Sequence, residues 1–291
     1  MPAPAARHLE TIPFTADDGV SNALCLVKAH PTAKHTVLMM PAMGVPAHKY
    51  EPLMQALAQL GVTAGVFDLR GHGASSIRPS RKVDFSYSEL VEHDLPAAIN
   101  TIRHHTNNRP ITLLGHSLGG QVSMLSLANS NIDINGIALV ASCSVYYRGW
   151  PWPESWSILL FSQVCNLTAQ LCGYFPGHRF RFGGNEARGV MRDWAHNART
   201  GTYRLAHSKV DYEARLKQIN IPVLAINFTD DKLAPASATQ KLLEKLDQKS
   251  PQHCVILDGS MLGTKRADHF AFLRHPNKVA ETVVNWLNPH G

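Results

Sequence analysis

One hexapeptide in the chain has the residue types and spacing of an activated serine. Residues 115–120 read Gly-His-Ser-Leu-Gly-Gly, and Gly-x-Ser-x-Gly between a strand and a helix forms a sharp turn that exposes a serine hydroxyl. Glycine at 115 and 119 lacks the Cβ atoms that would clash in such a turn. A helix starting at Leu118 would direct N–H groups toward developing negative charge. The pattern therefore predicts Ser117 as a nucleophile; the structural alternative is a glycine-rich turn that merely contains serine.

A serine hydroxyl needs a base that takes its proton, and histidine is the expected one. The chain has 16 histidines, so position along the chain must decide between them. In proteins with this serine turn, an acid and then the histidine follow the serine, which favours the loop 258–276. That loop contains His269 and His275. His275 precedes Pro276, as a residue at a helix boundary does, so we predict His269 as the base. His116, beside the serine, is expected to be structural.

The carboxylate that orients the histidine is expected after the apolar run 221–228. Two candidates stand there, Asp230 and Asp231. Such an acid holds the imidazole tautomer and stabilises the imidazolium, whereas an Asx turn at a strand end is the structural alternative. Asp258, after the next strand, is a weaker candidate. The residues alone leave Asp230 and Asp231 open.

The same chemistry needs two backbone N–H donors for the oxyanion. One comes from the residue after the nucleophile, here Leu118. The other comes from the loop after the first core strand, Pro41-Ala42-Met43-Gly44, in which Met43 is the expected donor. An ordinary strand-to-helix loop is the structural alternative.

These residues require elements that bring distant stretches of chain together. Apolar runs typical of strands lie at 23–29, 36–40, 62–67, 111–114, 136–141, 221–228 and 254–257. Helical spacing is found at 50–60, 86–104, 118–128, 237–246 and 277–287, with Pro96 a candidate kink. Strands that alternate with helices predict a parallel sheet with helices on both faces.

The alternation stops at about residue 143. Residues 143–215 carry most of the tryptophans, many arginines and little strand pattern. We predict a helical cap inserted after the sixth strand, over the carboxyl edge of the sheet. The chain would then consist of a first core part (1–142), the cap (143–215) and a second core part (216–291).

Aromatic residues of the predicted cap are candidates for the roof of a substrate pocket. An aromatic roof suits an apolar acyl group or an aromatic substrate, although packing of the cap onto the core is the commoner role. Arg179 and Arg188 could bind an anionic group, but surface ion pairs are the commoner role of such arginines. Substrate-binding residues therefore stay open. The aromatic candidates are Tyr146, Tyr147, Trp150, Trp152, Trp156 and Phe161.

Composition excludes several classes of protein. Hydrophobic residues make up 44% and charged residues 17% of the 291 residues, which excludes a disordered chain. The net charge is +6, but the sequence contains no long run of like-charged residues, so no nucleic-acid partner is expected. The sequence contains no run of eighteen apolar residues, so no transmembrane helix is expected. Five cysteines without a CxxC pair predict neither a zinc site nor a disulfide framework.

The N-terminus shapes the expected location. It reads Met-Pro-Ala-Pro-Ala-Ala-Arg-His and lacks the apolar core of a signal peptide. Together with the irregular cysteines, it predicts a cytoplasmic protein. We expect no cofactor and no metal; the oligomeric state stays open.

Taken together, these residues resemble the α/β-hydrolase superfamily over nearly the whole chain. The most specific segments are Asp68-Leu-Arg-Gly-His-Gly-Ala-Ser75, the hexapeptide at 115–120, and Asp231 four residues before Pro235. The superfamily's D-x-x-x-P spacing implies Asp231, not Asp230, as the acid. One departure is Pro41-Ala42, where the superfamily often has His-Gly; a backbone donor needs no particular side chain.

Within the superfamily, the chain is similar to predicted hydrolases near the serine aminopeptidase (S33-like) set. Residues 173–177, 188–190 and 193–194 resemble the cap of one bacterial branch, and His269-Phe-Ala-Phe272 resembles that branch's His-Phe-Gly-Phe. The resemblance implies an eight-stranded, mostly parallel sheet and a triad of Ser117, Asp231 and His269. It supplies no substrate.

The expected activity is cleavage of an ester, thioester or amide of a small-molecule acyl substrate through an acyl-enzyme. A carboxylic ester hydrolase is the leading prediction, with a peptidase as a variant of it. The alternatives are a non-catalytic hydrolase-fold protein that binds a ligand, and an acyltransferase. A filled triad argues against the first and does not separate the second from hydrolysis.

Overall fold

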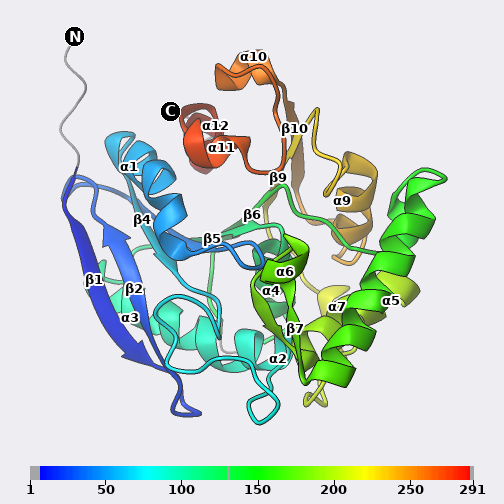
Figure 1. Cartoon of the computed structure of the whole chain (residues 1–291). Coiled ribbons are helices and arrows are strands. Elements are labelled where there is room, and N and C mark those ends of the chain that lie inside the picture. Colours follow the sequence, from blue (N-terminus) through cyan, green and yellow to red (C-terminus); the bar gives the residue numbers. More distant parts are fainter. Residues whose placement is uncertain (1–6, 130–131, 289–291) are drawn as a thin grey trace.

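The computed structural model describes residues 7–129 and 132–288 (Figure 1). Residues 1–6, on which the expectation about a signal peptide partly rests, lie outside these ranges. None of the helices within the two ranges is both long enough and apolar enough to cross a membrane.

One eight-stranded sheet forms the centre of the described structure. Its order is β1-β2-β4-β3-β5-β6-β9-β10. The pairs β1–β2 and β2–β4 are antiparallel, and every later pair is parallel. The predicted mostly parallel eight-stranded sheet is therefore confirmed. The strands are β1 (Leu9–Thr15), β2 (Ser21–Val27), β3 (His35–Met40), β4 (Val62–Phe67), β5 (Ile111–His116), β6 (Gly136–Val140), β9 (Val223–Phe228) and β10 (Gln252–Leu257).

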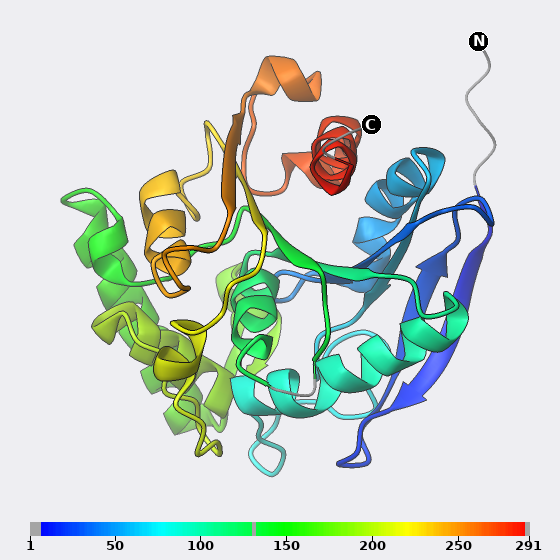
Figure 2. The same cartoon turned by 180° about the vertical axis from the view of Figure 1, so that it is seen from behind.

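Helices cover both faces of this sheet. Successive residues of a strand point to opposite faces: in β3, Val37 and Met39 join one core cluster, whereas Leu38 and Met40 join the other. The first cluster includes α1 (Glu51–Gln59) and α12 (Asn277–Leu287). The second includes α3 (Leu95–His105), α4 (Leu118–Ser126) and α9 (Ala236–Leu243). Figures 1 and 2 show α1 and α12 on one side of the sheet and α3 and α4 on the other.

The predicted helix 86–104 is present but is not uniform. It consists of α2 (Tyr87–Glu89), a five-residue π-helical turn (Leu90–Asp94) and α3. Pro96 has no N–H, and its ring would meet the carbonyl group four residues earlier. The wider turn, in which the Leu95 N–H bonds the Leu90 carbonyl oxygen, lies directly before this proline. The predicted kink thus takes the form of a π turn.

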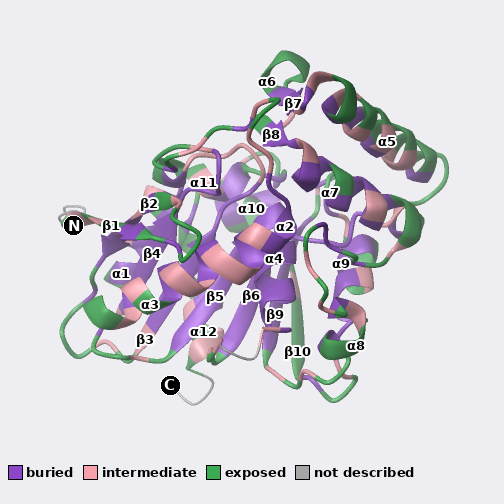
Figure 3. Cartoon of the chain, turned by 90° about the horizontal axis from the view of Figure 1, so that it is seen from below, coloured by how far each residue is buried: buried purple, intermediate pink, exposed green. Residues whose placement is uncertain are grey.

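The segment 143–215 lies between β6 and β9 and is mostly helical. Its helices are α5 (Glu154–Cys172), α6 (Gly177–Phe180), α7 (Arg188–Thr200) and α8 (Tyr212–Leu216). It also holds an antiparallel pair, β7 (Tyr174–Pro176) and β8 (Asn185–Ala187), which the sequence pattern did not indicate. Strands of three residues are too short to give a period-two pattern. Figure 3 shows buried strands and α4 at the centre, and an exposed outer side on α5.

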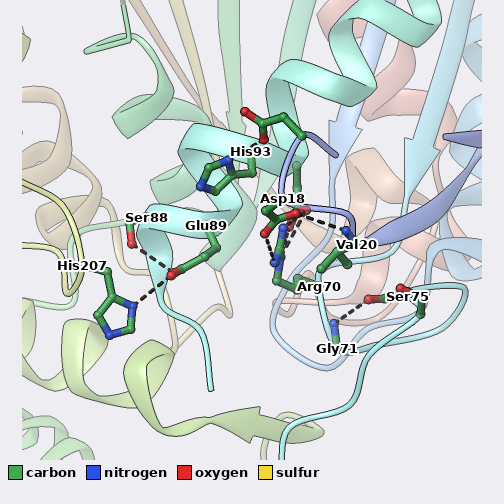
Figure 4. Close-up of polar contacts among 12 residues, drawn as sticks. Asp18, Val20, Arg70, Gly71, Ser75, Ser88, Glu89, His93 and His207 are labelled. Carbon is green, nitrogen blue, oxygen red and sulfur yellow. Dashed lines mark hydrogen bonds and ion pairs between the residues drawn. The ribbon is translucent and has the colours of Figure 1, made fainter. Parts of the chain in front are cut away.

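The motif Asp68–Ser75, which carried part of the resemblance, is built around a buried arginine. Arg70 is 3% exposed; it donates to Asp18 Oδ2 at 2.6 Å and to Asp94 Oδ1 at 2.7 Å. The Gly71 N–H donates to the Ser75 hydroxyl at 3.1 Å (Figure 4). Arg70 thereby joins the loop after β4 to the β1–β2 turn and to the π turn, which is a structural function.

Ion pairs also connect the segment 143–215 to the core. His207 Nδ1 lies 2.9 Å from Glu89 Oε1, which α2 supplies (Figure 4). His72 Nε2 lies 3.1 Å from Glu186 Oε2, which β8 supplies, and Glu186 is 2% exposed. Burial disfavours the charged imidazole, but the Glu186 carboxylate outweighs it with further help from Asp68, and the pKa of His72 is raised. These two contacts help to hold the segment against the core.

Candidate active site

Ser117 occupies the turn between β5 and α4, and its backbone is strained. Its φ of 53° and ψ of −118° lie in a region that non-glycine residues rarely adopt. Three contacts hold it there. Its N–H donates to the Val140 carbonyl oxygen at 3.2 Å, and its own carbonyl oxygen accepts from the Gly120 N–H at 3.0 Å and the Ser142 hydroxyl at 2.7 Å.

Two glycines allow this turn to close. A Cβ on Gly115 would lie 2.2 Å from the Gly120 Cα, and one on Gly119 would lie 2.1 Å from the Met40 carbonyl oxygen. Both distances are shorter than any real contact, so a side chain at either position would displace backbone. The geometry agrees with the sequence-based reason for glycine at 115 and 119.

The structure brings His269 and Asp231 together. His269 Nδ1 lies 2.8 Å from Asp231 Oδ2, and both residues are buried, at 5% and 6% exposure. Asp231 Oδ1 accepts the N–H groups of Leu233 and Ala234 at 2.8 and 3.1 Å. The same carboxylate therefore closes the turn after β9 and binds the imidazole. With Nδ1 engaged, Nε2 is the nitrogen left for proton transfer.

The rival candidates have other partners. Asp230 Oδ2 accepts the Ala267 N–H at 2.9 Å, which ties the turn after β9 to the histidine loop. Asp258 caps α10 (Gly259–Leu262) by accepting the Met261 N–H. His275 is exposed and ends α11 (Ala271–Arg274). Of these candidates, only Asp231 contacts the His269 ring.

The two predicted oxyanion donors, Met43 and Leu118, lie in the lining of the same cavity. Leu118 is the first residue of α4, where N–H groups lack helical partners. Met43 lies in the loop after β3, and among the described residues its N–H has no hydrogen-bond partner. The Ala42 N–H instead donates to the Tyr50 hydroxyl at 2.8 Å. Both predicted donors line one cavity with Ser117.

His116 is fully buried and connects three loops of the site. Tyr50 Oη accepts the Ala42 N–H, so its own hydrogen is directed to His116 Nδ1, 2.7 Å away. His116 Nε2 then donates to the His269 carbonyl oxygen at 3.1 Å. Burial, with the neighbouring His269, lowers the pKa of His116 well below its usual value, so the ring is neutral. His116 therefore has a structural function: through Tyr50 it joins the His269 loop to the loop after β3.

A cavity of about 310 Å³ opens over Ser117 and His269. Its lining is largely apolar. Among the described residues no hydrogen bond joins the Ser117 hydroxyl to the His269 ring, and such bonds often tighten only when a substrate is bound. The lining residues are Ala42, Met43, Ser117, Leu118, Gln121, Cys143, Val145, Trp150, Ile158, Phe161, Arg181, Phe182, Gly183, Trp194, Leu233, His269 and Phe270.

Some of the predicted aromatic and arginine candidates line this cavity and others do not. Of the six predicted roof aromatics, only Trp150 and Phe161 line it. Arg188 pairs with Asp84 at 3.1 Å, and neither it nor Arg179 reaches the cavity. Arg181, which lies between them in the sequence, does line the cavity.

Sequence reasoning missed Gln121, Phe182 and Trp194 as lining residues. Gln121 had a usable signal, because it follows Ser117 by four residues and i, i+4 positions share a helix face. Phe182 and Trp194 had no comparable signal, since they reach the cavity from the segment 143–215. Burial raises the pKa of the Cys143 thiol, so this lining cysteine stays protonated. Within the described ranges, no group of three or more His, Cys, Asp or Glu side chains is arranged to hold a metal ion.

Two curated relatives are similar to this chain in sequence. The pimeloyl-[acyl-carrier protein] methyl ester esterase of Stenotrophomonas maltophilia is 25% identical over 254 residues, which cover 82% of this chain and 87% of the esterase. The monoglyceride lipase of Rattus norvegicus is 29% identical over 110 residues, which cover 38% of this chain and only 35% of the lipase.

Solved structures agree in fold. An esterase of Pyrococcus furiosus has a TM-score of 0.61 at 15% identity, covering 97% of this chain and 91% of its own. An esterase of Exiguobacterium antarcticum has a TM-score of 0.61 at 16% identity, covering 96% and 100%. The family model described as serine aminopeptidase, S33, matches residues 31–261. With this sheet order and most of its length inside that match, the chain belongs to the serine aminopeptidase S33 family and has the α/β-hydrolase fold.

Proposed function

We propose that the chain is a serine hydrolase that cleaves carboxylic esters through an acyl-enzyme, with Ser117 as nucleophile, His269 as base and Asp231 as the orienting acid. Family and fold support hydrolytic activity. The observation that carries the finer proposal is the buried 2.8 Å contact between His269 and Asp231, beside a serine held at a φ of 53° on the same cavity.

In the first step, the Ser117 oxygen attacks the ester carbonyl carbon while His269 Nε2 takes the hydroxyl proton. Asp231 accepts from Nδ1–H, which fixes the tautomer and stabilises the imidazolium. The N–H groups of Met43 and Leu118 receive the oxyanion. The imidazolium then gives its proton to the leaving alcohol, and the acyl group stays on Ser117.

In the second step, water attacks the acyl-enzyme. His269 Nε2 takes a proton from that water as its oxygen bonds to the acyl carbon. The imidazolium then returns the proton to the Ser117 oxygen as the bond from that oxygen to the acyl carbon breaks, which releases the carboxylic acid and restores the hydroxyl. An acceptor other than water would make the same intermediate an acyl transfer, and the triad does not distinguish the two.

We propose esters ahead of thioesters and amides, since the two relatives above are named as a lipase and a methyl ester esterase. The apolar lining suits an acyl group of moderate size. The segment 143–215 supplies Val145, Trp150, Ile158, Phe161 and other lining residues, so we propose that it acts as a cap over the site.

The test is a panel of p-nitrophenyl esters of graded acyl length, with kcat/KM measured for the parent protein and for Ser117→Ala. Turnover is expected for the parent, with a burst of p-nitrophenol if deacylation is slow, and none above background for the variant. Turnover by Ser117→Ala would exclude this nucleophile. Absence of turnover by the parent, with tight ligand binding, would favour a binding protein.

A further inference from the structure

The wall of the cavity carries a buried amide that the proposed mechanism does not use. Gln121 is 2% exposed and lines the cavity. It belongs to α4, one helical turn beyond Ser117, and α4 is the helix that begins at the nucleophile. Ser117 and Gln121 line the same cavity. The proposed mechanism therefore places the amide within a few bonds of a carbonyl group bound at Ser117.

The orientation of this amide is fixed by Tyr87. Tyr87 is fully buried, and its hydroxyl donates to Gln121 Oε1 at 3.1 Å. A buried phenol hydrogen needs an acceptor, and Oε1 is the acceptor that the structure provides. The amide oxygen is thus engaged, which leaves the NH2 group on the other side.

The Gln121 NH2 group has no partner within the described ranges. The amide nitrogen is not among the fully enclosed polar atoms without a partner, so it keeps some accessible surface, and Gln121 lines the cavity. Two other polar groups of the lining differ in this respect. The Trp150 indole N–H donates to the Lys232 carbonyl oxygen at 3.1 Å, and the Cys143 thiol to that of Leu233 at 3.7 Å.

We infer that Gln121 selects esters that carry a second acceptor oxygen a few bonds from the scissile carbonyl, such as an ether, keto or hydroxyl oxygen. This inference rests on the proposed ester hydrolysis and adds its substrate class. A purely aliphatic ester would displace water from the amide without replacing the hydrogen bond. A site built in this way rejects the analogue that lacks the oxygen, because a buried donor is left unpaired.

The second oxygen can stand on the acyl side or on the alcohol side, and two sets of matched esters separate these sources. The acyl set pairs p-nitrophenyl hexanoate with its analogues in which the third, fourth or fifth chain atom is an ether oxygen. The alcohol set pairs butyl hexanoate with 2-methoxyethyl hexanoate. Within each set, the ether oxygen replaces a methylene group of nearly the same size.

Three variants test the residue. Gln121→Leu removes the amide, Tyr87→Phe keeps the amide and frees its orientation, and the double variant removes both partners so that no phenol hydrogen is left unpaired. Thermal unfolding identifies variants that fail to fold; the double variant keeps the test usable if Gln121→Leu is one of them.

For the parent, kcat/KM is expected to favour one ether ester over its alkyl partner by about 10-fold, the effect of one hydrogen bond. Gln121→Leu and the double variant should lose that preference, measured as the ratio of kcat/KM for the ether ester to kcat/KM for its alkyl partner. Tyr87→Phe should retain part of it. Each preference is the ratio of kcat/KM for the ether ester to kcat/KM for its alkyl partner. The intrinsic reactivity of the two esters is the same for parent and variant, so it cancels when their preferences are compared.

Equal preference in the parent and in Gln121→Leu, in both sets, would overturn the inference and leave ester hydrolysis intact. Absence of turnover with any ester, together with no Ser117-dependent covalent labelling by a fluorophosphonate, would instead contradict the proposed function. A preference confined to one set assigns the second oxygen to that side of the ester.

Discussion

The two oxygens of the Asp231 carboxylate have different hydrogen-bond partners. One oxygen closes the turn after β9 and the other binds the imidazole. The neighbouring Asp230 faces the Ala267 N–H instead. Adjacent, chemically identical residues therefore have different partners, and the backbone turn decides which of them faces His269.

This contrast gives a prediction with a built-in control. In Asp231→Asn the amide oxygen can still close the turn, but the NH2 group meets His269 Nδ1 and favours the wrong tautomer. We expect kcat/KM for a p-nitrophenyl ester to fall by about 10,000-fold. Asp230→Asn should retain activity within about 10-fold, since it loses only part of a loop contact. Equal losses in the two variants would contradict the assignment of Asp231.

Sequence could predict much at this scale, but not all of it. Glycine spacing around Ser117 and the position of His269 in the last loop were sufficient to select residues that the structure brings to one cavity. The choice between Asp230 and Asp231 needed the family's spacing to Pro235. The orientation of the Gln121 amide depends on Tyr87, which lies 34 residues away, and no local pattern indicates it.

At the scale of elements, the site depends on three loops that different strands deliver. The chain of hydrogen bonds from Ala42 through Tyr50 and His116 to His269 joins the loop after β3, the end of β5 and the loop that contains His269. Each group in it is buried, so a missing member leaves a partner without a bond.

Tyr50→Phe tests this chain. The variant leaves the Ala42 N–H and His116 Nδ1 unpaired, which should lower the free energy of unfolding by about 1–3 kcal/mol and kcat/KM by about 10-fold as both loops relax. Tyr212→Phe is the control, because it loses a partly buried hydroxyl contact to Glu92 at 2.6 Å that involves none of the three loops. Chemical denaturation and ester kinetics measure the two effects. An activity loss of equal size in both variants would show that stability alone is responsible.

Prediction of the elements succeeded where a period was long enough to count. The apolar runs of β3, β4, β5, β6 and β9 and the helical stripe of α12 were all located. β1 was not located, although an eight-stranded sheet was expected. Its few apolar residues stand among polar ones, and only one of its seven residues is buried. The three-residue strands β7 and β8 and the π turn before Pro96 depend on tertiary packing and on a missing N–H group, which periodicity does not report.

For the whole molecule, the segment 143–215 is joined to the core by contacts between residues far apart in sequence. His72 and Glu186 are separated by 114 positions, and Asp193 accepts the N–H groups of Tyr87 and Ala206. An inserted segment is visible in the sequence as a break in the strand–helix alternation. Its packing is not, since these pairings join residues that no local spacing relates.

Asp193 makes the stability of the whole molecule depend on pH. It is 2% exposed, and burial raises its pKa from 3.8 to about 7, although two N–H groups favour its charged form. Between these values the folded state holds a proton that the unfolded chain releases. The free energy of unfolding should therefore fall through this group as pH rises from about 4 to about 7.

Asp193→Asn lacks this titration. Urea unfolding at about pH 5 and about pH 8 should show a larger loss of stability for the parent than for the variant. The variant loses one acceptor oxygen, but that loss is the same at both pH values. The change in its free energy of unfolding between the two pH values can therefore be compared with that of the parent. Parallel changes in the two proteins would contradict the buried, protonated state of Asp193.

The most direct measurement of the proposed mechanism is covalent labelling with a fluorophosphonate, followed by peptide mapping and by labelling rates of variants. Phosphonate should be found on Ser117, at a rate that His269→Ala lowers by several orders of magnitude because the hydroxyl loses its base. Label on another residue, or an undiminished rate in His269→Ala, would contradict the account.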